Sequence, residues 1–122
     1  MRLLKLWLPV AAWAGIIFFF SSVPDLKTGL KYDLFLRKIA HVTEYFILAF
    51  FLYRALSGSF KMDPRRLFIS AAVFTLLYAA SDEIHQFFVE GRNCSLGDFL
   101  IDSLGVVCLY ATIKLKQRRQ RC

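Results

Sequence analysis

The sequence predicts an all-α integral membrane protein, a four-helix bundle with both termini on the cytoplasmic side. Of its 122 residues, 57% are hydrophobic and 20% are charged, whereas soluble domains average about 45–50% and about 25%. The charged residues lie in short clusters between apolar runs of roughly 6–20, 39–56, 67–80 and 99–115. Lys and Arg are distributed unequally between the connections, and this inequality indicates the orientation of a membrane protein.

The first two predicted spans comprise residues 3–20 and 39–56. A transmembrane helix needs about 20 mostly apolar residues, and amphipathic flanks extend the shorter runs to that length. Pro24 follows the first span, where proline cannot continue a helix, and Gly58 is expected as the C-cap of the second. A cleaved signal peptide is the alternative for the first span, but no small-residue cleavage site follows it.

The third and fourth predicted spans comprise residues 65–89 and 98–115. Asp63 and Pro64 are typical of a helix start, with an N-cap acid and a proline at the first helical position. Ser95–Asp98 has the spacing of a capping box and should open the last helix. Nothing in the chain resembles a linker or a repeat, so residues 1–122 are expected to form one domain.

The basic residues predict which side faces the cytoplasm. Five of them lie on one side: Lys27, Lys31, Arg37, Lys38 and Arg92. Eleven lie on the other: Arg2, Lys5, Arg54, Lys61, Arg65, Arg66, Lys114, Lys116, Arg118, Arg119 and Arg121. The richer side should be cytoplasmic. The basic tail is expected to lie against anionic lipid, and no nucleic-acid partner is predicted.

Polar residues gather in the outer halves of the last three helices, and helical spacing sorts them onto faces. They are Lys38, His41, Glu44 and Tyr45; then Asp82, His85 and Gln86, with Glu83 about a third of a turn away; and finally Asp98, Asp102 and Gly105. Glu44 and Asp102 are predicted about 10 Å inside the membrane, where charged residues usually face the bundle.

Each of these residues alone has an ordinary structural explanation, such as a helix cap for Asp98 or an interhelical pair of His41 with Glu44. The convergence of three helices favours a functional site, because ionisable residues inside a membrane commonly serve one. Asp82, Asp98 and Asp102 could hold a hard cation, but no tight ligand signature accompanies them and no metal is predicted. No cofactor is assigned.

Three sequence stretches match a known family: FSS after the first span, KIAHVTEYFILAF in the second, and SDEIHQFFVEGRNCSLGDFLIDSLG across the third and fourth. The chain resembles the VanZ-like family of small bacterial membrane proteins, whose namesake is linked to teicoplanin resistance. The resemblance covers nearly the whole chain. It implies characteristic positions at Lys38, His41, Tyr45, Asp82, Glu83, Gln86, Gly91, Arg92, Asp98, Asp102 and Gly105. Some members carry Asn in place of Asp102, and the familiar Pro-Gly-Arg is Glu90-Gly91-Arg92 here.

The leading functional hypothesis is a multi-pass protein of the bacterial cytoplasmic membrane that acts on or shields a lipid-linked wall component, or binds a glycopeptide, at the outer leaflet. Arg92 and Lys38 would hold a phosphate or carboxylate, while His41 with Glu44 or Asp82 would serve as general base and orienter. The candidate catalytic residues are His41, Glu44, Asp82 and Glu83. The candidate substrate-binding residues are Lys38, Tyr45, Gln86, Arg92, Asp98 and Asp102.

Whether such a protein catalyses a reaction or only binds is left open by the sequence, as is its oligomeric state. The alternative function is a small four-helix drug exporter, which fits the size and the number of spans. Such exporters typically carry a key acid in the first helix and little charge bias. This chain has no acid in residues 3–20 and a strong bias of basic residues.

Overall fold

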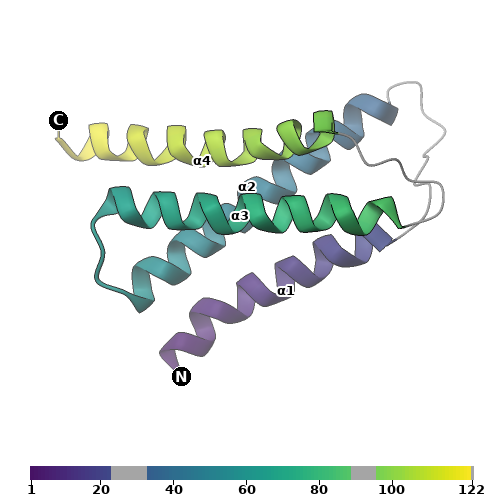
Figure 1. Cartoon of the computed structure of the whole chain (residues 1–122). Coiled ribbons are helices and arrows are strands. Elements are labelled where there is room, and N and C mark those ends of the chain that lie inside the picture. Colours follow the sequence, from purple (N-terminus) through teal and green to yellow (C-terminus); the bar gives the residue numbers. More distant parts are fainter. Residues whose placement is uncertain (23–32, 89–95, 122) are drawn as a thin grey trace.

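The computed structural model describes residues 1–22, 33–88 and 96–121, which form four α-helices and no strand. The helices are α1 (Arg2–Ser22), α2 (Asp33–Ser59), α3 (Pro64–Phe87) and α4 (Leu96–Arg121) (Figure 1). The prediction of an all-α, four-helix protein is therefore confirmed.

Two helices extend well beyond their apolar runs. Helix α2 begins at Asp33 rather than at residue 39, and α4 continues to Arg121 rather than ending at residue 115. Leu, Lys, Arg and Gln have high helix propensities, so residues 33–38 before α2's apolar run and 116–121 after α4's can continue the helices. The expected C-cap at Gly58 is wrong, because α2 ends at Ser59 and Gly58 lies within its last turn. A Cβ on Gly58 would lie 2.5 Å from Leu6 Cδ1, so the glycine makes room for α1.

The backbone at the start of α3 agrees with the predicted helix start, but the predicted capping side chain does not. Asp63 is the N-cap residue, in an extended conformation, and Pro64 is the first helical residue. The Asp63 side chain makes no capping hydrogen bond; its Oδ1 instead lies 3.4 Å from Nε of Arg66. The N-cap expected at Ser95 lies outside the described residues.

Helices α2 and α3 each contact all three other helices, and α2 makes the more extensive contacts, so it is the central element. Figure 1 shows it running obliquely behind α3, between α1 and α4. One buried apolar cluster joins α1, α2 and α3 around Ile17, Leu48 and Leu52. A second joins α2 to α4 through Ala49, Val106 and Leu109. The core therefore follows α2 along its length.

Three polar contacts attach α1 to this core. The Trp7 indole N–H donates to Ser59 Oγ at 2.8 Å, and the Trp13 indole N–H donates to the Glu44 carbonyl at 2.9 Å. The Tyr78 hydroxyl donates to the carbonyl of Ala14. Indole and phenol groups usually find such partners when they are removed from water.

The outer surface of the bundle is strongly apolar, with large exposed side chains such as Phe19, Phe74, Leu77 and Val107. Such an exterior is costly in water and is what a lipid environment requires. Among the described residues, three helices are long and apolar enough to cross a membrane: Arg2–Phe20, Lys38–Ser59 and Pro64–Phe87. The chain is therefore a multi-pass membrane protein. A crossing by α4 and the orientation of the termini stay predictions.

Candidate functional site

Five polar side chains of the described residues are almost completely buried: Thr75, Asp82, Glu83, Gln86 and Asp102 are each at most 4% exposed. The Thr75 hydroxyl donates to the Ala71 carbonyl of its own helix at 2.7 Å, which explains its burial locally. The other four are three carboxyl groups and one amide. Burying such groups costs free energy unless they are hydrogen-bonded or paired. The side chains that contact them are therefore treated as part of the candidate site.

The first partnership joins α2 to α4. His41 Nδ1 lies 3.0 Å from Asp102 Oδ1, with the side chains 20% and 0% exposed. This contact has the distance of an ion pair but not the geometry of a hydrogen bond. A carboxylate beside Nδ1 favours the tautomer with the proton on that nitrogen, which leaves the lone pair on Nε2. The pair thus combines a buried orienting acid with a histidine that reaches the protein surface, which is the arrangement of a general base.

Gly105 explains how α2 and α4 come close enough for this pair. A Cβ added to Gly105 would lie 2.6 Å from the backbone nitrogen of Phe46 and 2.8 Å from the carbonyl oxygen of Val42. Both are main-chain atoms, which cannot move aside as a flexible side chain can. The two backbones therefore touch at Gly105, one turn beyond Asp102, in the way that small residues allow between membrane helices.

The second partnership joins α2 to α3. The Tyr45 hydroxyl donates to Asp82 Oδ2 at 3.0 Å, and the two residues are 0% and 4% exposed. Among the described residues, no hydrogen-bond donor reaches Asp82 Oδ1. Tyr45 and His41 lie one turn apart on α2, so this helix presents both polar partnerships to its neighbours.

Helix α3 buries a wider set than its predicted face. Asp82, Glu83 and Gln86 are all buried, whereas His85 is only partly buried and stacks on Phe18 of α1, with ring centroids 4.5 Å apart. Glu83, expected about a third of a turn from the face of Asp82, His85 and Gln86, is buried as well. Because α3 has neighbours on more than one side, burial covers an arc of about 100°.

The remaining predicted residues lie apart from this buried set. Lys38 is exposed near the start of α2, and Glu44 is half-buried on the part of α2 whose backbone contacts Trp13. Arg92 and the side chain of Asp98 lie outside the described residues. Sequence reasoning placed Asp102 among substrate-binding residues and missed its pairing with His41. The Asp-x-x-Gly spacing from Asp102 to Gly105 is the signal that could have indicated a close helix contact there.

No metal site accompanies the cluster in the described part of the chain, which holds no group of three or more His, Cys, Asp or Glu side chains placed to bind an ion. The imidazole, carboxyl, phenol and amide groups of the cluster can transfer protons and form hydrogen bonds. His41 is the member that reaches the protein surface, and Asp102 on α4 is its buried carboxyl neighbour.

Comparison with known proteins gives two matches. A family model described as VanZ/LLP1 matches residues 6–117. The "Uncharacterized membrane protein YwnJ" of Bacillus subtilis (strain 168) is 29% identical over 114 residues, which cover 87% of this chain and 74% of YwnJ. No solved structure matches. The residues matched by the family model include the whole buried polar cluster, from His41 to Asp102.

Proposed function

Because this chain belongs to the VanZ/LLP1 family, we propose that it acts on or shields a lipid-linked cell-wall component at the outer leaflet of the bacterial cytoplasmic membrane. Its activity would lower susceptibility to glycopeptides such as teicoplanin. The observation that carries the proposal is the His41–Asp102 pair, 3.0 Å apart, with its acid fully buried and its imidazole partly exposed.

The pair has the properties needed at the boundary between lipid and water. A carboxylate-oriented imidazole can accept a proton from a hydroxyl or a water, and in its protonated form it can bind a phosphate oxygen. Lys38 is exposed one turn before His41 on the same helix, so it would add a positive charge beside the imidazole. These groups suit the phosphate of a lipid-linked precursor.

The test uses cells that express the full chain, the His41→Gln variant or the Asp102→Asn variant. We expect both variants to lose most of the protection against teicoplanin, because each removes the oriented base without removing a large side chain. His85→Gln is the matched control, since His85 is the second histidine of the chain and stacks on Phe18 instead. Full protection by His41→Gln would contradict the proposal.

Mass spectrometry of lipid-linked precursors from the same cells separates catalysis from shielding. An enzyme would leave a precursor of altered mass that disappears in the His41→Gln variant. A shielding protein would leave the precursor unchanged and protect in proportion to its expression level.

The orientation required by this proposal has its own test in intact cells. Cys94 follows Arg92 in the connection between α3 and α4, and it should react with a membrane-impermeant maleimide in a Cys108→Ala/Cys122→Ala background. Reaction only after permeabilisation would place this connection in the cytoplasm and remove the basis for a wall substrate.

Drug export is the second candidate function, and the buried carboxyl groups of Asp82, Glu83 and Asp102 favour it. Buried acids inside a bundle are used as proton relays in transporters. Proton-driven drug efflux from proteoliposomes, abolished by Asp82→Asn or Glu44→Gln, would support export over the wall proposal. We expect no such efflux.

A further inference from the structure

The end of the bundle opposite the buried cluster has a strong positive charge. Figure 1 shows the C-terminal part of α4 lying beside the first turns of α3. Arg65 and Arg66 belong to α3, and Lys114, Lys116, Arg118, Arg119 and Arg121 belong to α4. In the described part of this region the acid is Asp63, and it lies 3.4 Å from Arg66.

A groove of about 640 Å³ separates the start of α3 from the end of α4. Phe68 and Ile69 of α3 and Ile113 of α4 give it an apolar lining, while Arg65 and Lys114 bring cations to its edge. The ring centroids of Phe68 and Tyr110 lie 5.2 Å apart, so an aromatic pair joins the two helices there. The groove therefore offers an apolar wall and a cationic rim.

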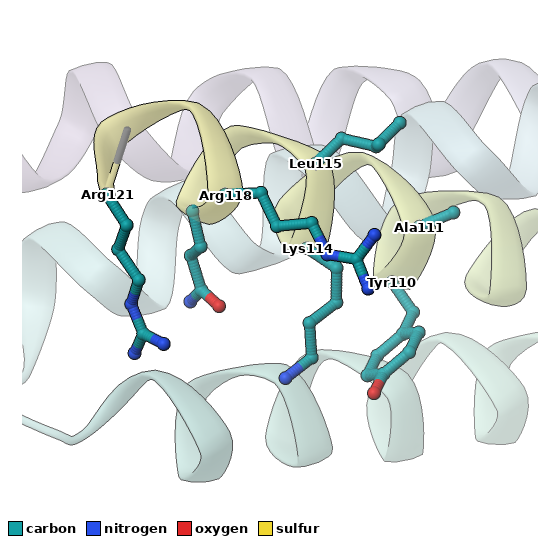
Figure 2. Close-up of a pocket in the computed structure, with 7 residues that line it drawn as sticks. Tyr110, Ala111, Lys114, Leu115, Arg118 and Arg121 are labelled. Atoms are coloured by element: carbon teal, nitrogen blue, oxygen red, sulfur yellow. The ribbon is translucent and has the colours of Figure 1, made fainter.

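A second hollow of about 650 Å³ continues around α4 and shares Tyr110, Lys114 and Gln117 with the groove. Figure 2 shows Tyr110 and Lys114 on one side of α4, with the Arg118 side chain running back along the helix toward Tyr110. Lys114 Nζ lies 5.5 Å from the centroid of the Tyr110 ring. Cations from successive turns of α4 are thus gathered beside one aromatic ring.

We propose that the groove, together with the hollow that shares Lys114 with it, binds one anionic phospholipid. Lys114, Arg65 of the groove and Arg118 of the hollow would hold its phosphate, and its acyl chains would lie against Phe68 and Ile113. Pro64 begins a helix that is long and apolar enough to span the membrane. The groove therefore lies where the headgroup layer meets the hydrocarbon. Basic pockets between helices at that depth recognise anionic headgroups. The apolar wall favours a lipid over a soluble phosphate.

The site is tested with the purified full chain in nanodiscs that contain dioleoylphosphatidylcholine and dioleoylphosphatidylglycerol. Native mass spectrometry counts the lipids that stay bound when the nanodisc is stripped away. The site variant is Lys114→Gln/Arg118→Gln. The matched control is Lys116→Gln/Arg119→Gln, which removes the same charge from the same helix at two exposed residues that do not line either hollow.

Both variants lose the same net charge, so the general attraction to an anionic bilayer falls equally. We expect the site variant to retain phosphatidylglycerol about tenfold less than the control variant, because it also loses charge-assisted hydrogen bonds to the phosphate. Circular dichroism should show equal helix content, since the substituted side chains are exposed or lie at the surface of α4. Equal retention by the two variants would overturn the proposal.

Inorganic phosphate separates a lipid site from a phosphate site. An excess of it should leave the retained phosphatidylglycerol in place, because free phosphate gains nothing from Phe68 and Ile113. Complete displacement by inorganic phosphate would show a simple anion site and contradict the assignment of a lipid.

Discussion

The two ends of the bundle hold charged residues in opposite ways. At one end, the side chain of Asp102 is fully buried against His41, and Asp82 accepts a hydrogen bond from the buried Tyr45. At the other end, the paired side chains of Arg66 and Asp63 are 78% and 56% exposed. Removing one partner of a buried pair lowers the free energy of unfolding strongly, whereas an exposed pair contributes about 0–1 kcal/mol to it. The comparison teaches that burial, more than the number of charges, determines which residues the fold depends on.

Removing one buried acid should give the largest effect on stability. We expect Asp102→Ala to lower the free energy of unfolding by about 3 kcal/mol, because it leaves the buried ring nitrogen of His41 without its acceptor. Asp63→Ala, at the other end, should cost at most about 1 kcal/mol. Unfolding in detergent mixtures, followed by circular dichroism, measures both. Equal losses in the two variants would contradict the difference between the ends.

The contact of α2 with α4 gives the next largest effect. Gly105→Ala would place a Cβ against the main chain of Val42 and Phe46, and we expect a loss of about 1–3 kcal/mol from overpacking. The control is Gly15→Ala, since a Cβ there meets nothing within 4 Å. That change should stabilise α1 by about 0.5–1 kcal/mol through helix propensity. The same unfolding assay measures both variants. If Gly105→Ala raised the free energy of unfolding as Gly15→Ala should, the close contact at Gly105 would be contradicted.

A smaller loss is expected from Tyr45→Phe. It removes the hydroxyl that donates to Asp82 and leaves a buried carboxylate oxygen without that donor, at a cost of about 1–3 kcal/mol. Tyr110→Phe tests an exposed tyrosine at the basic end and should change the thermal midpoint little. A stabilised Tyr45→Phe variant would show that the hydrogen bond does not offset the burial of its own hydroxyl.

The smallest effect concerns salt at the exposed end. Arg66→Gln should cost less than about 1 kcal/mol, and the cost should vanish at high ionic strength, because exposed pairs are screened. The loss in Asp102→Ala should persist in the same salt series, since a buried pair is screened far less. If the stability loss of both variants fell with added salt, the proposed difference between the exposed and the buried pair would be contradicted.

The sequence predicted the helices well because lipid imposes a simple requirement on them. Each apolar run became a helix, and Asp63 and Pro64 marked the start of α3 correctly. The true ends of α2 and α4 were missed, because residues such as those of the basic tail continue a helix without adding any apolar signal. The ends of helices that continue into charged flanks therefore have to be located in the structure.

The helix faces of the polar residues could be predicted from the sequence, but their pairings could not. Periodicity placed His41 and Tyr45 on one face of their helix, and depth in the membrane predicted that Glu44 and Asp102 face the bundle. The structure buries Tyr45 and Asp102 and partly buries His41 and Glu44. Periodicity did not predict that His41 meets Asp102, because this depends on where α2 and α4 cross. That crossing is fixed at Gly105, by a contact between backbones distant in the sequence.

The tautomer of His41 tests the central claim most directly. Nitrogen-15 NMR of the imidazole groups in nanodiscs, with His85→Gln to leave one histidine signal, reports which ring nitrogen carries the proton. The account predicts a neutral ring protonated at Nδ1, which becomes a mixture of tautomers in the Asp102→Asn/His85→Gln variant. A ring protonated at Nε2, unaffected by the change at Asp102, would show that the buried acid does not orient His41 and would contradict the site.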